Sequence, residues 1–208
     1  LYDRPLIHHI MENMRKVGIE TVYVIVNYEK DKIKNYFKRL STSEDGIDVD
    51  VSFIEQKRLL GIAHAIMLTE RYIDESFMVI LGDDCTITKS LYNLTSTFLK
   101  TDAIVLEGIV EEEDEDILKS TCCVKLNSNK QITHIIEKPK KPISNLRGCG
   151  VYLFQNDVFE YIKETPVSRI RNEIEITDVI NMVAKKGRAY GEFIDGLNIN
   201  INSHDDLL

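Results

Sequence analysis

The segment FMVILGDDCTI, residues 77–87, carries an apolar run directly into two adjacent carboxylates. A continuous apolar run is typical of a strand that is covered on both faces. Gly82, Asp83 and Asp84 interrupt this run before it resumes. Either the two acids only form a turn, or one of them holds a cation at the tip of a buried strand.

Other strands alternate with amphipathic helices through the first half of the chain. Apolar and β-branched runs predict strands at 21–28, 49–56 and 102–110, and helical spacing predicts helices at 5–17, 29–40, 61–73 and 90–100. Strands that alternate with helices of this length favour right-handed crossover connections. The pattern therefore predicts an α/β fold in which helices cover both faces of a mostly parallel sheet.

The pattern changes in the second half. Residues 120–139 predict two strands joined at Asn127–Lys130, which form a small antiparallel hairpin excursion. Further strands are predicted at 147–154, 189–196 and 197–203, and further helices at 156–164 and 173–187. The acidic run 111–116 is most simply a solvated loop. No linker, repeat or low-complexity tract interrupts the chain, so we expect a single domain over residues 1–208.

Composition and charge narrow the class of protein. A net charge of −8 argues against a nucleic-acid-coating role, although one local group of cationic side chains is enough to bind a phosphate. No apolar run approaches the roughly 20 residues of a membrane span, and no signal peptide is visible, so we expect a cytoplasmic chain. The four cysteines lie in or beside apolar stretches without C-x-x-C spacing, which favours buried thiols.

Two short motifs in the second half combine polar side chains with strand ends or glycines. In IEKP, residues 136–139, Glu137 is an acceptor that suits a sugar hydroxyl, and Lys138 is a mobile cation that suits a phosphate. The alternative is an ordinary surface ion pair before a loop. In RGCGVY, Gly148 and Gly150 either allow a ligand to approach the backbone or mark a bulge in a core strand.

Two further segments contain candidate binding residues. Gln56 follows a predicted strand and Gly61 opens a predicted helix, and such groups can read the edge of a base. Ordinary loop polarity is the alternative for Gln56. Arg171 is a candidate anion-binding residue, whereas Glu173 and Thr177 are better explained as residues that cap the next helix.

Taken in order, these segments resemble one family across essentially the whole chain. YDRPLIHHIMENMRKVGIETVYVIVNY, EQ…LGIAHAI, VILGDD, IEKP, GCGVYLF, EIEITDVI and NINSHDDL look like the sugar-phosphate nucleotidyltransferases, or NDP-sugar pyrophosphorylases, of the glucose-1-phosphate thymidylyltransferase and uridylyltransferase type. The resemblance implies a Rossmann-like three-layer sandwich. It also implies Mg²⁺-dependent transfer of a nucleotidyl group from an NTP to a sugar 1-phosphate, with pyrophosphate as the leaving group.

The resemblance assigns cation and phosphate contacts. Asp83 matches the metal-binding Asp after the central strand, and the resemblance also assigns it to nucleotide binding. Asn200 stands where the family has its second metal ligand, with Asn202 as the fallback. Lys138 matches the phosphate-binding Lys, and Arg171 falls where some relatives place a phosphate-contacting Arg, so these two are the expected catalytic cations.

The resemblance also assigns the contacts to the base and the sugar. Gln56 and Gly61 match base-contacting positions, and Glu137 and Gly150 match sugar-binding positions. UTP or dTTP is favoured as the nucleotide. Members of the family are often dimers or tetramers, so the resemblance is compatible with a homo-oligomer. Neither a nucleic acid nor a membrane is an expected partner.

Two departures from the family pattern leave an alternative open. The family's Gly-rich loop, which supplies backbone donors, an Arg and a Lys to the phosphates, precedes the segment YDRPLI and is absent from the sequence. The family's Tyr-Gly pair appears as Thr121-Cys122, which puts one sugar contact in doubt. The alternatives are therefore an enzyme, a non-catalytic regulatory or binding paralogue of the same fold, and an unrelated nucleotide-binding α/β protein.

Overall fold

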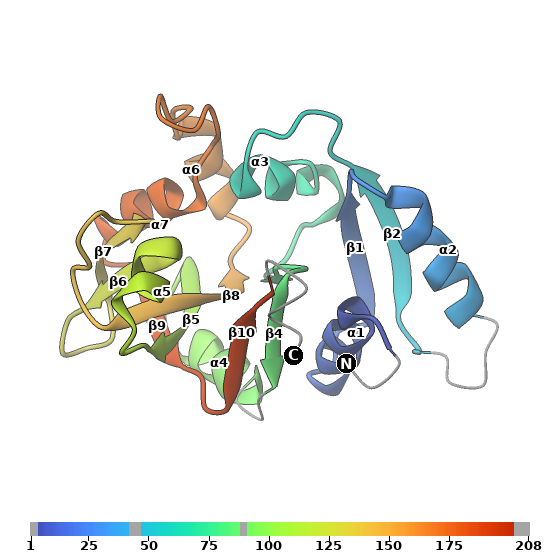
Figure 1. The fold of residues 1–208 in the computed structure, drawn as a ribbon, viewed down its shortest axis with the longest axis horizontal. Coiled ribbons are helices and arrows are strands. Elements are labelled where there is room, and N and C mark those ends of the chain that lie inside the picture. The colour runs from blue at the N-terminus through green and yellow to red at the C-terminus, as the bar shows by residue number, and fades with distance from the viewer. Residues whose placement is uncertain (1–3, 42–46, 88–90, 202–208) are drawn as a thin grey trace.

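The computed structural model describes residues 4–41, 47–87 and 91–201. Its first part is one helix–strand repeat: α1 (Leu6–Lys16), β1 (Thr21–Val26), α2 (Lys30–Leu40) and β2 (Asp50–Glu55). The strands β1 and β2 pair in parallel, with Thr21 opposite Asp50 and Val26 opposite Glu55. This unit, shown in blue and cyan in Figure 1, stands to one side of the main sheet. Each of these elements confirms the segment predicted for it.

The middle of the chain contains the quoted segment, and it folds as two strands. The elements are α3 (Ile62–Met67), the 3-10 helix η1 (Glu70–Tyr72), β3 (Phe77–Ile80), β4 (Asp84–Ile87), α4 (Leu91–Lys100) and β5 (Val105–Glu111). A turn at Gly82 and Asp83 separates β3 from β4, and the amide of Asp84 donates to the carbonyl of Leu81 at 3.2 Å. The turn that was one of the alternatives for the two acids is therefore present at the end of β3, and the separate strand β4 was not predicted.

The last part supplies the remaining strands and helices. They are α5 (Glu115–Ser120), β6 (Cys122–Leu126), β7 (Ile132–Glu137), β8 (Leu146–Phe154), α6 (Val158–Glu164), α7 (Ile176–Ala184), β9 (Ala189–Phe193) and β10 (Leu197–Asn200). The acidic run predicted as a loop contributes the start of α5. Asp114 caps that helix, because its Oδ1 accepts from the amides of Asp116 at 2.8 Å and Ile117 at 3.4 Å.

The main sheet is mixed, which corrects the expectation of a mostly parallel one. Its strand order is β7-β6-β8-β5-β9, with β3 also paired to β8. Only β5 and β9 are parallel within it, whereas β8 is antiparallel to β3, β5 and β6. No helix separates β6, β7 and β8 in the chain, so helical crossovers do not set their directions as they do in parallel units.

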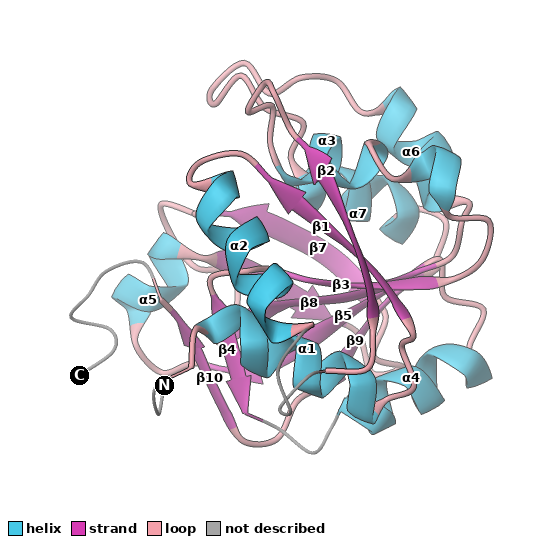
Figure 2. Cartoon of the chain, turned by 90° about the vertical axis from the view of Figure 1, so that its right-hand side faces the viewer, coloured by secondary structure: helices cyan, strands magenta, loops and turns pink. Residues whose placement is uncertain are grey.

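Helices nevertheless cover both faces of this sheet, so the α/β three-layer architecture is confirmed. Val105 and Ile109 of β5 pack in one apolar cluster with α6 and α7, while the alternate residues Leu106 and Val110 pack with α4. This alternation follows from the two-residue period of a strand. Figure 2 shows α1 and α2 on the near side of the strands and α7 behind them.

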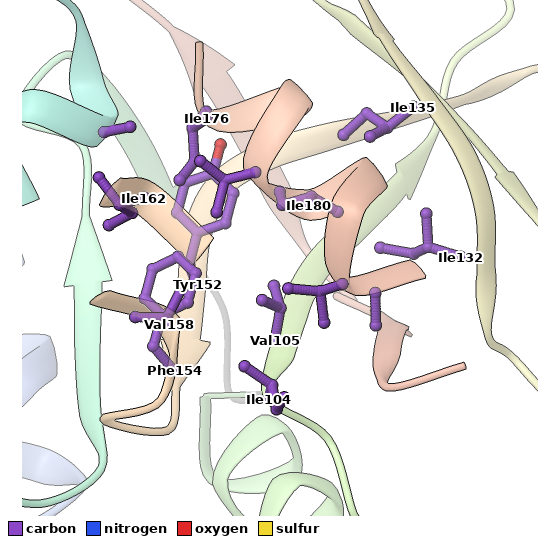
Figure 3. Packing of buried hydrophobic residues seen from close by; sticks show 14 of the residues in the cluster. Ile104, Val105, Ile132, Ile135, Tyr152, Phe154, Val158, Ile162, Ile176 and Ile180 are labelled. Carbon is purple, nitrogen blue, oxygen red and sulfur yellow. The ribbon is translucent and has the colours of Figure 1, made fainter. Parts of the chain in front are cut away.

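The larger of these clusters lies under α7. Ile176 and Ile180 of that helix face Tyr152 and Phe154 of β8 (Figure 3), and all four side chains are almost completely buried. The longest helices in the described ranges have 11 residues, so none of them is long enough to cross a bilayer. The four cysteines are free and buried, as predicted.

Candidate active site

A cleft of about 990 Å³ separates β1 from β3. Consecutive residues line it on both sides: 21–25 from β1, and 77–80 from β3 together with Leu81 and Gly82, which follow that strand. Side chains alternate between the two faces of a strand, so an uninterrupted run along a cavity means that the backbone edge of the strand faces it. Among the described strands, β1 pairs only with β2 and β3 only with β8. The two edges that border the cleft therefore have no described strand partner.

Apolar side chains line the cleft beside these edges. The helix α1 contributes Ile7, Ile10 and Met11, and α3 contributes Ile62 and Ile66. The lining is polar at the positions of Gln56 and Glu173. The cleft is thus an apolar slot with a few polar groups, as is usual for ligand sites.

Gln56 and Gly61 both line this cleft, so the structure brings together the two residues predicted to contact a base. Gln56 is 8% exposed, and its Nε2 lies 3.1 Å from the carbonyl of Gly61, to which it donates. The same Nε2 lies 2.9 Å from Nδ1 of His64. The side-chain amide that was predicted to read a base is thus held within its own loop, and its contact with a base remains a prediction.

Gly61 is required by its surroundings. Its φ is 92°, and a Cβ at this position would lie 2.8 Å from the carbonyl oxygen of Ile174. The amide of Ile174 donates to the carbonyl of Leu60 at 2.8 Å. The loop that follows β2 is therefore joined to the segment that precedes α7, and the glycine is what allows the two backbones to meet.

Asp83 and Asp84 lie in different environments. Asp83 is exposed in the turn after β3, whereas Asp84 is 2% exposed. Oδ1 of Asp84 accepts from Thr86 Oγ1 at 2.9 Å and from Nδ2 of Asn198. Burial raises the pKa of Asp84 to about 6, although these hydrogen bonds oppose the shift. Asp83 is thus the exposed carboxylate of the two, whereas Asp84 is buried and hydrogen-bonded within the protein.

The second predicted metal ligand lies on the neighbouring strand. β4 and β10 are antiparallel, with Asn200 opposite Asp84, and the amide of Ile201 donates to the carbonyl of Asp83 at 2.8 Å. The backbone at Asn200 is therefore beside the two acids, although its side chain lies outside the described part, as does all of Asn202. Within residues 4–41, 47–87 and 91–201 no group of three or more His, Cys, Asp or Glu side chains could hold a metal.

Glu137, Lys138 and Arg171 form a second group. Arg171 donates through Nη2 to the carbonyl of Glu137 at 3.4 Å and through Nη1 to Oε1 of Glu175 at 2.9 Å. Burial raises the pKa of Glu137, and the charge of Arg171 opposes this shift. Lys138 is exposed and has a left-handed φ of 46°, which costs a non-glycine residue about 1 kcal/mol. Strain of this kind often occurs at functional sites.

Gly150 lies against the acids at the turn. The amide of Leu81 donates to the carbonyl of Gly150 at 2.9 Å, and Gly150 has a φ of 67°. The β5–β8 pairing shifts register beside these glycines, between Glu107 and Ile109. The bulge interpretation of RGCGVY is thus present in the structure, and the predicted sugar contact of Gly150 remains a prediction.

The capping role assigned to Glu173 and Thr177 is wrong. The residue before α7 is Glu175, and it makes no side-chain cap hydrogen bond. Glu173 instead packs against Gly61 at the cleft, and Thr177 is buried in the second position of the helix. Sequence reasoning also missed Arg147, Asn198 and Glu107, which are buried or half-buried polar residues in otherwise strand-like segments. A charged residue inside an apolar strand was the available signal for Arg147 and Glu107.

These features describe an α/β protein with a cleft beside strand ends, where ligands of open α/β sheets bind. The comparisons place it more narrowly. A family model described as Nucleotidyl transferase matches residues 1–199, so the chain belongs to that family. The resemblance seen in the sequence is thereby confirmed.

Individual relatives agree with this placement. The chain is 30% identical over 207 residues to "Bifunctional protein GlmU" of Methanococcus maripaludis, covering 99% of this chain and 46% of that protein. It is 29% identical over 204 residues to "UTP–glucose-1-phosphate uridylyltransferase AglF" of Haloferax volcanii, covering 98% and 81% respectively. The chain thus spans about half the length of the GlmU proteins that it matches.

Solved structures show the same likeness in three dimensions. The structure of a UDP-glucose pyrophosphorylase complexed with UDP-glucose superposes with a TM-score of 0.87 at 27% identity. The match covers 98% of this chain and 84% of that one. The Rossmann-like fold class implied by the resemblance is therefore confirmed.

Proposed function

We propose that this chain is the catalytic part of a sugar-1-phosphate nucleotidyltransferase, which joins an NTP and a sugar 1-phosphate into an NDP-sugar and pyrophosphate. UTP or dTTP is the favoured nucleotide. The observation that carries the proposal is that residues following two different strands line one cleft: Gln56 and Gly61 follow β2, and Gly82, beside Asp83, follows β3. Membership of the nucleotidyl transferase family and the activities named for AglF and the pyrophosphorylase support it.

The reaction needs positioning and charge neutralisation more than a covalent intermediate. An oxygen of the sugar phosphate attacks the α-phosphorus of the NTP, the bond from that phosphorus to the bridging oxygen breaks, and pyrophosphate leaves with the electron pair. Lys138, exposed at the end of β7, would meet a phosphate. Arg171, fixed by Glu137 and Glu175, would meet a second anionic group.

The donor set at the β4–β10 tip fits Mg²⁺. The carboxylate of Asp83 is exposed while its carbonyl already accepts from Ile201, and Asn200 is the neighbouring oxygen-bearing residue. Mg²⁺ is usually held by one or two carboxylates together with water and phosphate oxygens, so a cluster of three protein acids is not required. When bound, the ion would neutralise the phosphate charge that develops during transfer.

We also propose that an extended segment pairs with the edges of β1 and β3 that have no described strand partner, and that it carries the Gly-rich phosphate loop that the family resemblance calls for. The lining supports this, since consecutive backbone positions face the cleft from both strands and apolar side chains from α1 and α3 border it. A strand inserted there would satisfy backbone groups on both edges.

The Thr121-Cys122 pair favours the alternative of a non-catalytic paralogue. Cys122 is 9% exposed, and its thiol donates to the carboxylate of the buried Glu107. The side chain is therefore part of the core and does not supply the family's sugar contact. A paralogue would keep sugar-nucleotide binding without turnover.

Pyrophosphate release separates these functions. The full-length protein would be incubated with Mg²⁺ and each pair of UTP or dTTP with glucose 1-phosphate or N-acetylglucosamine 1-phosphate. We expect release with at least one pair. Binding of a UDP-sugar without release from any pair would favour the paralogue, and the absence of both binding and release would overturn the proposal.

A further inference from the structure

Asn198 of β10 joins three strands through its side chain. Its Nδ2 donates to Oδ1 of Asp84 and lies 2.8 Å from Oγ1 of Thr86, both on β4. The same nitrogen lies 3.4 Å from the carbonyl of Cys149 on β8. A side-chain amide has only two N–H donors, so these acceptors use its full capacity. A single half-buried amide thus links β4, β8 and β10.

Arg147 of β8 fixes the orientation of that amide. It donates through Nη1 to Oδ1 of Asn198 at 2.6 Å and through Nη2 to the carbonyl of Asn198 at 3.0 Å. Its Nε donates to Oε2 of Glu112 at 3.3 Å. Arg147 is 6% exposed, and a buried guanidinium is tolerated only when it is paired and hydrogen-bonded in this way. A lysine could not reproduce the two-pronged contact, because its ammonium is a point charge.

These contacts matter because the β4–β10 pair is a sheet of its own. No backbone ladder among the described strands joins it to the six-stranded sheet. Among the described residues, the polar contacts that hold it, apart from its chain connections, are those of Asn198 and Arg147 and one from α1, where Asn13 Nδ2 donates to the carbonyl of Thr86 at 3.1 Å. Asn198 lies two residues from Asn200, which is opposite Asp84. Any shift of this pair relative to β8 would move Asp83 and Asn200.

We propose that Arg147 and Asn198 are positioning residues for the divalent cation: Arg147 orients the amide of Asn198, and that amide fixes the β4–β10 tip on which Asp83 and Asn200 are carried. The inference rests on the proposed function, because it requires a cation at that tip. It goes further by assigning a role to two residues that are not among the predicted contacts of the cation or the substrates.

Direct binding of Mn²⁺, followed by the EPR signal of the free ion, tests the inference without relying on turnover. The variants are Asn198→Ala, Arg147→Lys and the milder Thr86→Val. Gln131→Ala is the matched control, because it loses the 2.8 Å hydrogen bond from its Nε2 to the carbonyl of Gly187, away from the β4–β10 pair. Loss of a residue that supports metal ligands typically weakens binding 10- to 100-fold, so we expect about a tenfold weaker Kd for Asn198→Ala and Arg147→Lys. We expect a smaller loss for Thr86→Val and wild-type binding for Gln131→Ala.

Kinetics give a second readout that a merely structural role would not produce. The Mg²⁺ concentration for half-maximal activity should rise in Asn198→Ala and Arg147→Lys, while the KM for the sugar 1-phosphate stays within about twofold, because the Glu137 group is on other strands. Folded variants with wild-type Mn²⁺ binding would overturn the positioning role alone. A wild-type protein that turns over without binding Mn²⁺ would overturn the metal assignment and the inference with it. If Asn198→Ala fails to fold, Mn²⁺ binding by Thr86→Val and Arg147→Lys tests the positioning role instead.

Discussion

Gly150 lies so close to Asp84 that a Cβ at position 150 would be 2.8 Å from Oδ2 of that buried carboxylate. The φ of Gly150 is 67°, so a side chain would also be strained there. The two residues come from β8 and β4, and their contact is part of what places the β4–β10 tip against the main sheet. This relationship gives the first prediction.

Gly150→Ala should destabilise the protein by about 2 kcal/mol or more, because it adds left-handed strain and a clash with a buried charge. Chemical denaturation measures the loss. Gly82→Ala is the matched control, since no atom lies within 4 Å of its added Cβ and its φ is not in the left-handed region. Equal stability of the two variants would contradict the prediction.

Glu107 should make stability fall as the pH rises. The side chain is completely buried, its Oε2 has no hydrogen-bond partner among the described residues, and burial raises its pKa to about 8. Between the unfolded pKa of about 4.3 and the folded value, the folded state binds a proton that the unfolded state has lost. The free energy of unfolding should therefore fall with rising pH across this window, by up to about 1.4 kcal/mol per pH unit from this group.

Glu107→Gln should remove that slope, because the amide does not titrate. The measurement is the free energy of unfolding from pH 5 to pH 8 for the wild type, for Glu107→Gln and for the exposed control Glu113→Gln. The control should keep the wild-type slope. An unchanged slope in Glu107→Gln would show that another group titrates, and Asp84, with its pKa raised to about 6, would then be the next to test.

The two acids of the opening segment should separate activity from stability. Asp83→Ala should lower kcat by more than about a hundredfold with little change in Tm, because the side chain is exposed and proposed to hold the cation. Asp84→Ala should lower Tm by several degrees, because it leaves the amide of Asn198 and the hydroxyl of Thr86 without their carboxylate acceptor. Wild-type turnover in Asp83→Ala would remove the metal assignment.

Lys138→Gly should make the protein more stable and less active. Glycine accepts the left-handed conformation at this position, so stability should rise by about 1 kcal/mol, whereas the loss of the cation should lower kcat. Lys130, with a φ of 60° at the β6–β7 connection, is the control: Lys130→Gly should gain stability and keep its activity. Unchanged turnover in Lys138→Gly would exclude Lys138 from the reaction.

The part of the fold that the sequence predicted best is the part encoded by local periodicity. The apolar spacing of α1, the β-branched run of β1 and the amphipathic pattern of α2 each correspond to an observed element. The boundary at Gly82 was harder, because β4 exists through its pairing with residues 197–200. No pattern within residues 77–87 reveals a partner more than 100 positions away.

The site shows the same division. Gln56, Gly61 and Asp83 were predicted from motifs, each of which occupies one short segment. The contacts that join Arg147, Asn198 and Asp84 could not be predicted in this way, since these residues come from β8, β10 and β4 and no single segment contains the pairing. The mixed direction of the main sheet was missed because β8 is reached without a helical crossover.

The cleft between β1 and β3 also bears on how this protein behaves in solution. Strand edges without a partner strand are templates for pairing with other chains, and natural proteins avoid leaving them open. If no segment pairs with the two edges that border this cleft, the protein should therefore tend toward strand exchange and aggregation. Pairing of the proposed segment with β1 and β3 would cover both edges and suppress self-association. The segment proposed to carry the phosphate loop would therefore also keep the protein from aggregating.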